Sequence, residues 1–322
     1  MTSKPAISND HPVFPPLAGL FLGILAVSTA SIFIRFAQAE VPSLVIAAGR
    51  MGFATLLISP FVFLGKTKRN LQWGRQTWSL IILAGVFLGF HFATWITSLE
   101  YTSVASSVVL VTTAPLWVAL LAPIFLKERL TRYVLIGLAI SLAGSVIVSL
   151  SGNCSLTSGT VTCSGLGAFF QGQHFLGNLL ALAGAFLSGG YLMVGRKVRS
   201  RVNLTSYAFF VYLIASIVLF VMVMISGQSL TGYSLPAYGW MLALALVPQL
   251  VGHTSFNWAL KYLPAAFVSI ALLGEPVGSV ILAYLFLHEK PVLFEIIGGI
   301  LILVGIGIST LRKPQVQEDN PL

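Results

Sequence analysis

Charged residues are scarce in this chain. Asp, Glu, Lys and Arg together make up 8% of the 322 residues, and only 9 residues are acidic. A soluble domain carries about a quarter charged residues. Hydrophobic residues instead reach 57%, and the mean hydropathy is +0.92. These values exclude a soluble globular domain and indicate a polytopic membrane protein.

The motifs of common enzymes and nucleotide-binding proteins are also absent from the sequence. It contains no His-Glu-x-x-His, no Gly-x-Ser-x-Gly and no glycine-rich phosphate loop. Its two cysteines fall short of the roughly four ligands that a structural zinc site uses. We therefore expect no enzymatic activity, no cofactor and no metal. Any concentrative transport would have to draw on a gradient rather than on ATP.

Long apolar runs account for most of the chain. A helix needs about 20 apolar residues to span a bilayer, and alternating strand patterns are missing. Ten runs are long enough: residues 16–38, 43–64, 77–98, 104–126, 132–150, 174–195, 204–226, 236–260, 265–287 and 291–311. We therefore predict an all-α polytopic membrane protein with ten transmembrane helices.

The basic residues follow this predicted topology. The formal net charge is +9, yet most of the 18 Lys and Arg residues fall in segments that are cytoplasmic if the N-terminus is inside. Arg35 and Arg50 lie within spans, and Lys290 lies on the outer side. This distribution places both termini in the cytoplasm and argues against nucleic acid as a partner. It fits a multi-pass protein of a bacterial-type plasma (inner) membrane.

One segment occurs twice, offset by half of the chain. Residues 114–130 read APLWVALLAPIFLKERL and residues 275–291 read EPVGSVILAYLFLHEKP, which aligns Pro115 with Pro276. The same offset aligns other residues without a gap, which indicates an internal duplication. Because each copy has five helices, an odd number, the second copy enters the membrane from the opposite face. The two five-helix copies therefore form an inverted repeat, in which a central site can open to either side. We expect both prolines to act as hinges, because proline disrupts a helix.

The duplication sets the predicted boundaries. They are a cytoplasmic tail (1–15), a first repeat (16–150), an outer-side connecting loop (151–173), a second repeat (174–311) and a cytoplasmic tail (312–322). The connecting loop contains Cys154 and Cys163. In an oxidising compartment these two would form a disulfide, and two free thiols are the alternative.

Several short elements together resemble the EamA-type members of the drug/metabolite transporter superfamily, which have two five-helix repeats. They are Arg50, Leu99-Glu100-Tyr101, Lys127-Glu128-Arg129-Leu130, Leu260-Lys261-Tyr262, Glu275-Pro276-Val277 and His288-Glu289-Lys290-Pro291. The resemblance covers nearly the whole chain. It implies alternating access and, for many members, export of small metabolites such as amino acids. It does not identify the substrate.

Two charged residues are predicted deep in the membrane, where a charge is costly unless it faces a cavity or a partner. At 1.5 Å per residue, Glu275 lies roughly 15 Å along its span and Arg50 roughly 10 Å along another. Glu275 would bind a substrate ammonium group or a coupling proton, or it is locked to Arg50 as structural glue. Arg50 would bind a substrate carboxylate or phosphate, or it neutralises Glu275.

Other polar and aromatic residues share helix faces. His91 and Trp95 are four residues apart, and Gln249, His253 and Asn257 form a stripe with the same spacing. In lipid such faces should point inward, where they line a cavity or make interhelical hydrogen bonds. We predict that all five contribute to substrate binding. For each histidine alone, a packing role is the alternative.

The repeat offers a further criterion for the site. Residues that are the same in both copies, such as Glu128 and Glu289, should serve hinges and turns, which both halves need. A substrate does not have the symmetry of the repeat, so the residues that bind it should differ between the copies. The substrate candidates are then the residues that break this symmetry: Glu275 opposite Ala114, Arg50 opposite Val211, His91 opposite Gly252 and Asn257 opposite Ile96.

One buried acid, one buried base and aromatic walls suit a zwitterion or an amphipathic amine. We predict a secondary transporter in the lipid bilayer that exports an amino acid or amine-like small molecule by alternating access. Protons are a candidate coupling ion, and a homodimer is a candidate assembly. One alternative is a sugar-phosphate or nucleotide-sugar exchanger, which would need several cavity cations. The other is a non-transporting membrane scaffold or receptor.

Overall fold

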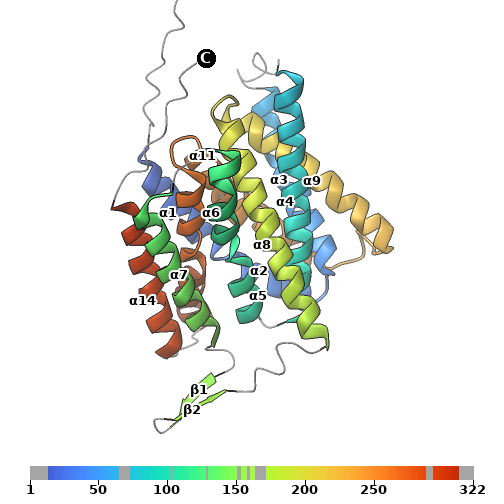
Figure 1. The fold of residues 1–322 in the computed structure, drawn as a ribbon. Coiled ribbons are helices and arrows are strands. Elements are labelled where there is room, and N and C mark those ends of the chain that lie inside the picture. The colour runs from blue at the N-terminus through green and yellow to red at the C-terminus, as the bar shows by residue number, and fades with distance from the viewer. Residues whose placement is uncertain are drawn as a thin grey trace, which may run out of the picture.

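A computed structural model describes residues 14–64, 73–102, 104–127, 130–150, 154–157, 160–163, 172–287 and 293–311. The predicted tails, much of the connecting loop, and the turn residues Glu128 and Glu289 lie outside this part of the chain. Within it, regular structure is helical apart from one pair of short strands (Figure 1).

The elements follow one another in this order. They are α1 (Pro16–Val27), α2 (Ala30–Gln38), α3 (Ser43–Phe63), α4 (Arg75–Tyr101), α5 (Val104–Val111), α6 (Ala114–Phe125), α7 (Arg132–Leu150), β1 (Cys154–Thr157), β2 (Thr160–Cys163), α8 (Gly172–Arg199), α9 (Leu204–Ser226), α10 (Leu235–Leu244), η3 (Ala245–His253), α11 (Thr254–Ala259), α12 (Ala265–Ala271), α13 (Gly274–Leu287) and α14 (Leu293–Thr310). The element η3 is a π-helix that joins α10 to α11.

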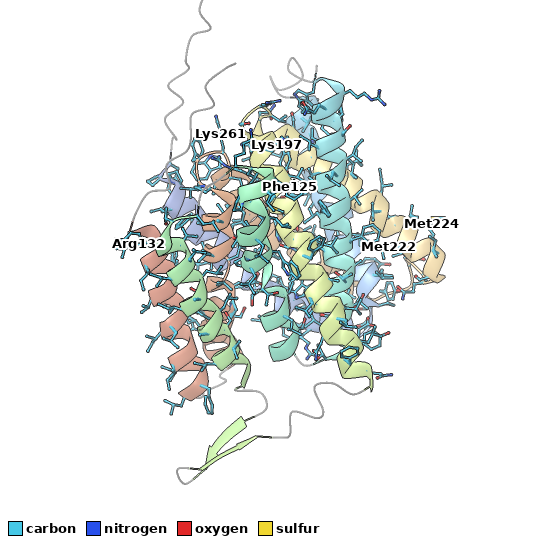
Figure 2. The ribbon with its side chains drawn as sticks, viewed as in Figure 1. Phe125, Arg132, Lys197, Met222, Met224 and Lys261 are labelled. Carbon is cyan, nitrogen blue, oxygen red and sulfur yellow. The ribbon has the colours of Figure 1, made fainter. Side chains whose placement is uncertain are left out.

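The helices have the length and surface of membrane spans. Six are long and apolar enough to cross a bilayer: Pro16–Gln38, Ser43–Phe63, Arg75–Tyr101, Phe175–Arg199, Leu204–Ser226 and Leu235–Ala259. Shorter apolar helices occupy the other predicted span positions in the described chain: Ala114–Phe125, Arg132–Ile147, Ala265–Ser279 and Ile296–Ser309. Large apolar side chains face outward, with Met224 75% and Ile225 82% exposed (Figure 2). The protein is therefore an integral membrane protein with helical spans, and the count of ten crossings stays a prediction.

Local sequence sets the turn between α9 and α10. Before α9, the Asn203 side chain accepts a hydrogen bond from Ser206 N at 2.9 Å, which satisfies a free donor of the first turn. Gly227 ends α9 with φ at 67°, a left-handed conformation that glycine adopts without steric cost. Ser234 caps α10 through Ala237 N at 3.3 Å. These signals set the bounds of α9 and the start of α10, which continues into η3.

The central helices form two bundles. In the α4–α8 bundle, α8 packs along α4 and against α5 and α6. In the α1–η3 bundle, α1 packs along η3 and α11 and against α12 and α13, and its continuation α2 packs on α10. Helices α3 and α9 pack on each other, α9 also on α4 and α3 also on η3. Each bundle thus combines elements from both halves of the sequence.

The duplication relates these two bundles to each other. A Cβ placed on Gly184 of α8 would lie 3.4 Å from the Trp95 side chain of α4. At the equivalent positions, a Cβ on Gly23 of α1 would lie 2.7 Å from the Phe256 side chain of α11. The same close approach is therefore built twice, once in each bundle.

The pair α7 and α14, at one side of the molecule, shows the inversion directly (Figure 1). A Cβ on Gly144 would lie 2.6 Å from Gly298 O, and one on Gly305 would lie 2.6 Å from Gly137 O. The two helices therefore run antiparallel, although they are equivalent in the repeat. Between these contacts Ser141 Oγ donates to Ile302 O at 3.2 Å, and these residues are 161 positions apart, which is the repeat offset. This confirms the predicted all-α fold of inverted repeats.

Gly305→Ala is expected to lower the unfolding temperature of the purified protein. The added methyl would lie 2.6 Å from Gly137 O and 2.8 Å from Ser141 N, which are backbone atoms that cannot rotate away. Such overpacking costs about 1–3 kcal/mol. Thermal unfolding in detergent, followed by tryptophan fluorescence, measures the effect. The control is Gly307→Ala on the same helix, where a Cβ meets no described atom within 4 Å. Equal unfolding temperatures for the two variants would contradict the expectation.

The strands β1 and β2 lie beyond one end of the bundle, opposite the end that carries Lys197 and Lys261 (Figures 1 and 2). We call these the hairpin end and the basic end. The strands pair antiparallel, and their register sets Cys154 opposite Cys163. Directly opposed residues have Cα atoms about 4.5–5.5 Å apart, within the range that a disulfide bridges. The backbone is thus compatible with the disulfide, which stays a prediction.

We expect the two cysteines to be oxidised in protein prepared without reductant. Alkylation of unfolded protein should then add no mass, and alkylation after reduction should add two labels, as measured by intact-protein mass spectrometry. A Cys154→Ser variant should form disulfide-linked dimers or label once without reductant. Two labels on the unreduced parent protein would establish free thiols instead.

Candidate functional site

A cavity of about 60 Å³ lies between the two bundles, where three spans are interrupted. The interruptions fall between α1 and α2 at Ser28–Thr29, between α5 and α6 at Thr112–Thr113, and between α12 and α13 at Leu272–Leu273. Irregular backbone at membrane depth is tolerated where it is enclosed by protein or lines a cavity. The polar and aromatic side chains at the cavity include Arg50, His91, Trp95, Tyr191, His253 and Glu275.

The two predicted hinge prolines lie just after two of these interruptions. Pro115 is the second residue of α6 and lines the cavity, and Pro276 is the third residue of α13. In the first turn of a helix the missing N–H would have had no intrahelical acceptor, so proline is accommodated there. The breaks therefore precede the prolines instead of following from a lost bond inside a helix. Whether the prolines bend during transport stays a prediction.

The third break is not marked by proline and is held by Ser28. Its hydroxyl lies 2.8 Å from Ile24 O in the same helix and 3.1 Å from Glu275 O. In return, Ser279 Oγ donates to Ser28 O at 3.0 Å. The break between α1 and α2 is thus bound to the start of α13, and it fixes the backbone that carries Glu275.

Arg50 is fully buried on α3 and only partly satisfied. Its Nε donates to Gln249 Oε1 at 2.9 Å, and its guanidinium carbon lies 4.1 Å from the centre of the Phe92 ring. One terminal nitrogen of the guanidinium has no hydrogen-bond partner among the residues that the structure describes. Because a buried cation with an unused donor is costly, this nitrogen is suited to an acceptor supplied from the cavity.

Glu275 occupies the start of α13, in the first turn, and lines the same cavity. Arg50 lines it as well, from α3. The structure describes no ion pair between them within 4 Å and no hydrogen bond to the Glu275 carboxylate. Both roles expected for Glu275, ligand or proton binding and structural glue with Arg50, stay predictions. A carboxylate and a guanidinium therefore face one cavity without neutralising each other by direct contact.

The stripe Gln249, His253 and Asn257 runs from η3 into α11. Gln249 bonds Arg50, and Asn257 Oδ1 accepts the Tyr191 hydroxyl at 2.7 Å. His253 lies in the cavity wall with its ring 5.3 Å from that of Phe92. Of the stripe, His253 alone is among the described residues that line the cavity, whereas Gln249 and Asn257 contact the site through Arg50 and Tyr191. Two of the three lie in a π-helix, an element that commonly marks functional sites.

His91 and Trp95 form an aromatic wall on α4. The rings are stacked, 5.9 Å apart and inclined by 13°. His91 Nδ1 lies 2.9 Å from Gly184 O, so this histidine also serves packing between α4 and α8. Trp95 Nε1 is buried without a partner in the described part of the chain. Both predicted roles of this pair, cavity wall and packing, are compatible with the structure.

The site has a surplus of unused hydrogen-bond donors. Among the residues that the structure describes, the buried side-chain donors without a partner around it include Arg50 NH1, Trp95 Nε1, Gln249 Nε2 and Asn257 Nδ2. Buried polar groups are normally paired, so such a cluster calls for a ligand or water rich in acceptors. Glu275 supplies the complementary acceptor for a cationic group.

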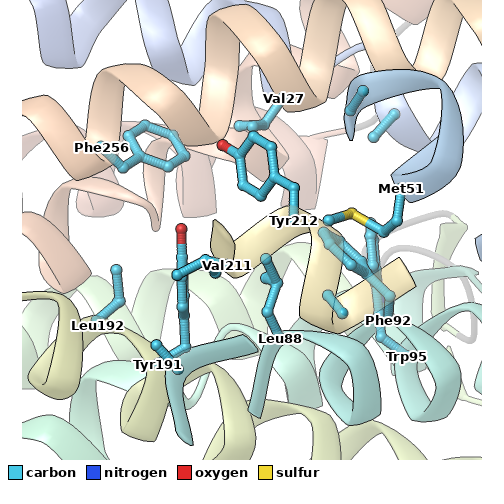
Figure 3. Close-up of a cluster of buried hydrophobic side chains, with 14 of the residues drawn as sticks. Val27, Met51, Leu88, Phe92, Trp95, Tyr191, Leu192, Val211, Tyr212 and Phe256 are labelled. Carbon is cyan, nitrogen blue, oxygen red and sulfur yellow. The ribbon is translucent and has the colours of Figure 1, made fainter. Parts of the chain in front are cut away.

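Two tyrosines at the site were not predicted. Tyr191 of α8 lines the cavity, and Tyr212 of α9 bonds Thr254 Oγ1 at 3.0 Å beside the η3 helix. Both side chains enter the same buried cluster as Phe92, Trp95 and Phe256 (Figure 3). The available signal was a hydroxyl inside an apolar span, which needs a partner just as a glutamine does.

These features define a class of protein: a helical membrane protein of inverted repeats with a polar cavity at interrupted helices, as in secondary transporters. The chain belongs to the EamA-like transporter family, whose model matches residues 16–150 and 175–311. It is therefore a member of the drug/metabolite transporter superfamily and contains two EamA repeats.

Relatives across this family are named as transporters. An uncharacterized transporter of Archaeoglobus fulgidus is 26% identical over 304 residues, covering 92% of this chain and 97% of that protein. The pseudopaline exporter CntI of Pseudomonas aeruginosa is 22% identical over 300 residues, with 92% and 97% covered. A probable terminal-alkyne amino-acid exporter of Streptantibioticus cattleyicolor is 21% identical over 203 residues, covering 63% of each.

A solved crystal structure shares the fold. It matches with a TM-score of 0.74 at 18% identity and covers 92% of this chain and 96% of its own. At this identity the likeness concerns the fold alone. The names of the relatives support a metabolite transporter rather than an enzyme.

Proposed function

We propose that the protein is an alternating-access exporter of a small metabolite that carries an amino group, with an amino acid or a related zwitterion as the preferred class. One observation carries the proposal: Arg50 and Glu275 line a single cavity, and the structure describes no ion pair between them. A zwitterion would place its carboxylate on Arg50 and its ammonium on Glu275. Each charge would then gain a partner in a low-dielectric site.

The unused donors support the same substrate class. Gln249 holds the Arg50 side chain through Nε, which leaves a terminal nitrogen for the carboxylate. Trp95 and His91 line the cavity and supply aromatic rings suited to the ammonium or to an apolar side chain. Among the cavity residues that the structure describes, Arg50 is the single Lys or Arg, which makes a sugar phosphate or nucleotide sugar a poor fit.

The size of the cavity supports a conformational cycle. At about 60 Å³ it holds a few waters, whereas ligand pockets measure about 300 Å³ or more. A metabolite would enter only if the two bundles move apart at one end. Three interrupted helices at the cavity level provide places where such movement can occur.

The direction and orientation are part of the proposal. Lys197 and Lys261 lie at the basic end, which we place in the cytoplasm according to the positive-inside rule. Two of the relatives are named exporters, which favours movement from the basic end to the hairpin end. A proton bound at Glu275 is the candidate coupling ion, and a bacterial-type plasma membrane is the proposed location.

Flux into proteoliposomes tests this function. The protein is reconstituted, and uptake of labelled amino acids and of their decarboxylated amines is measured with and without an imposed pH gradient. Protein-free liposomes and liposomes with an unrelated membrane protein are the controls. Saturable flux of a member of the panel is expected. Flux of sugar phosphates alone would favour the exchanger, and absence of flux for every compound would favour a scaffold or receptor.

A further inference from the structure

Two arginines at the end of α8 reach across to the end of α11. Arg199 is only 3% exposed, and its Nε donates to Asn257 O at 2.9 Å. Its terminal nitrogen NH1 donates to Val202 O. Arg196 donates to Leu260 O at 2.8 Å and to Lys261 O at 3.1 Å. The carbonyls at the end of a helix lack intrahelical donors, so these arginines satisfy groups that would otherwise need water.

These bonds cross from one bundle to the other at the basic end. Helix α8 belongs to the α4–α8 bundle, whereas α11 belongs to the α1–η3 bundle. The cavity between the bundles would have to open toward the basic end by separating α8 from α11. The arginine bonds oppose that separation, and burial of Arg199 makes its bond stronger than an exposed one.

Asn257 links this contact to the cavity. Its main-chain oxygen accepts from Arg199, and its side-chain oxygen accepts from Tyr191, which lines the cavity. The side-chain nitrogen of Asn257 is buried, and no described residue accepts a hydrogen bond from it. A ligand that moves Tyr191 or bonds the Asn257 amide would therefore act on the residue that holds the basic end closed.

The repeat places a counterpart at the hairpin end. Gln38 is the repeat equivalent of Arg199, and Ile96 is the equivalent of Asn257. Gln38 Nε2 lies 3.4 Å from Ile96 O and donates to Ser43 Oγ at 2.9 Å. This contact joins α2 of one bundle to α4 of the other. The two ends thus use the same positions, but the hairpin end has one long, neutral bond in place of a buried charged one.

We propose that Arg199 and Gln38 are the positioning residues of two alternating gates, one at each end of the transport pathway. The proposal rests on the proposed transport function. The arginine gate is the stronger, because charge-assisted hydrogen bonds are roughly twice as strong as neutral ones. The carrier therefore rests with its basic end closed and opens more readily at the hairpin end, and a substrate loads from the basic end only when the bond between Arg199 and Asn257 breaks.

Cysteine accessibility tests the gates without a substrate. In a Cys154→Ser, Cys163→Ser background, Ser188→Cys places one thiol in the cavity wall. Its labelling by a membrane-impermeant maleimide is timed from each face of sealed vesicles. A separate Ser200→Cys protein, with its thiol exposed at the basic end, reports which face that end occupies. Because no transport is measured, the result does not depend on finding the substrate.

Arg199→Gln should raise the labelling rate from the basic end by about tenfold or more, as expected for loss of a charge-assisted bond. Gln38→Leu should raise the rate from the hairpin end by a smaller factor, about two- to fivefold. The matched control is Arg201→Gln, which removes an equal charge from an exposed position two residues away. It should change neither rate.

Arg199→Lys separates loss of the hydrogen bond from unfolding of the variant protein. Lysine keeps the positive charge and can still donate to one of the two carbonyls. The labelling rate of this variant from the basic end should lie between those of the parent and Arg199→Gln. Rates that are unchanged in Arg199→Gln, or that rise equally from both faces, would overturn the proposal. If the gates behave as expected but no compound is transported, the proposed substrate class fails and the gates stand.

Discussion

Glu275→Gln is expected to reduce flux of an amino-acid or amine substrate by about a hundredfold without loss of folded protein. The Glu275 carboxylate has no partner in the part of the chain that the structure describes, so the fold does not depend on its charge. A substrate ammonium, however, would lose its counter-charge in a buried site, which typically costs 2–5 kcal/mol. Initial flux in proteoliposomes measures the effect, with the unfolding temperature as the check on folding.

Glu100→Gln is the matched control for this prediction. Its Oε1 accepts a hydrogen bond from Ser43 N at 3.0 Å, away from the cavity, and the amide oxygen of glutamine can replace it. Glu100→Gln should therefore keep its flux. If Glu275→Gln also kept full flux with the same response to a pH gradient, Glu275 would be neither the ammonium site nor the proton site.

The same variant separates the two roles proposed for Glu275. If the carboxylate binds the substrate, both gradient-driven uptake and substrate exchange at equal pH should fall together. If it carries the coupling proton, exchange should persist while uptake loses its dependence on the gradient. Counterflow of labelled against unlabelled substrate distinguishes these outcomes in one preparation.

The inverted fold could be predicted because it follows from quantities that the sequence shows directly. Span length, basic residues in loops and the repeated segment around Pro115 and Pro276 require no knowledge of packing. The family match and the antiparallel contact of α7 with α14 agree with them. The positions at which the helices are interrupted could not all be predicted from the sequence. Ser28 carries no sequence signal of a break, because its hydroxyl is held by the backbone of Glu275, far away in the chain.

Part of the candidate site could also be predicted from the sequence. Arg50 and Glu275 stand out because a charge at membrane depth needs an enclosure, whatever its partner. The partner itself depends on the packing of helices. Gln249 reaches Arg50 from a π-helix, whose wider turn an α-helical spacing rule does not anticipate.

At two positions the structure shows which contacts are made by the repeat equivalents of the polar candidate residues. The equivalent of Arg50 is Val211, which is fully buried in the apolar core. The equivalent of His91 is Gly252, where a Cβ would lie 3.4 Å from Gly23 O, just as His91 bonds Gly184 O. One copy of each contact therefore carries a polar side chain beside the cavity, and the other serves packing alone.

Arg50→Met is expected to discriminate between substrates that have a carboxylate and those that lack one. If Arg50 binds the carboxylate, flux of an amino acid should fall by about thirtyfold or more, while flux of its decarboxylated amine should change little. Methionine fills much of the same volume and retains contact with Phe92, and replacing a buried charge by an apolar group is often tolerated by the fold. The ratio of the two fluxes therefore separates binding from general damage, because a damaged carrier would lose both.

Arg35→Met, which replaces an exposed arginine on α2, is the control and should leave the ratio unchanged. Equal losses for the amino acid and the amine would assign Arg50 to the structure, through Gln249, and not to the carboxylate.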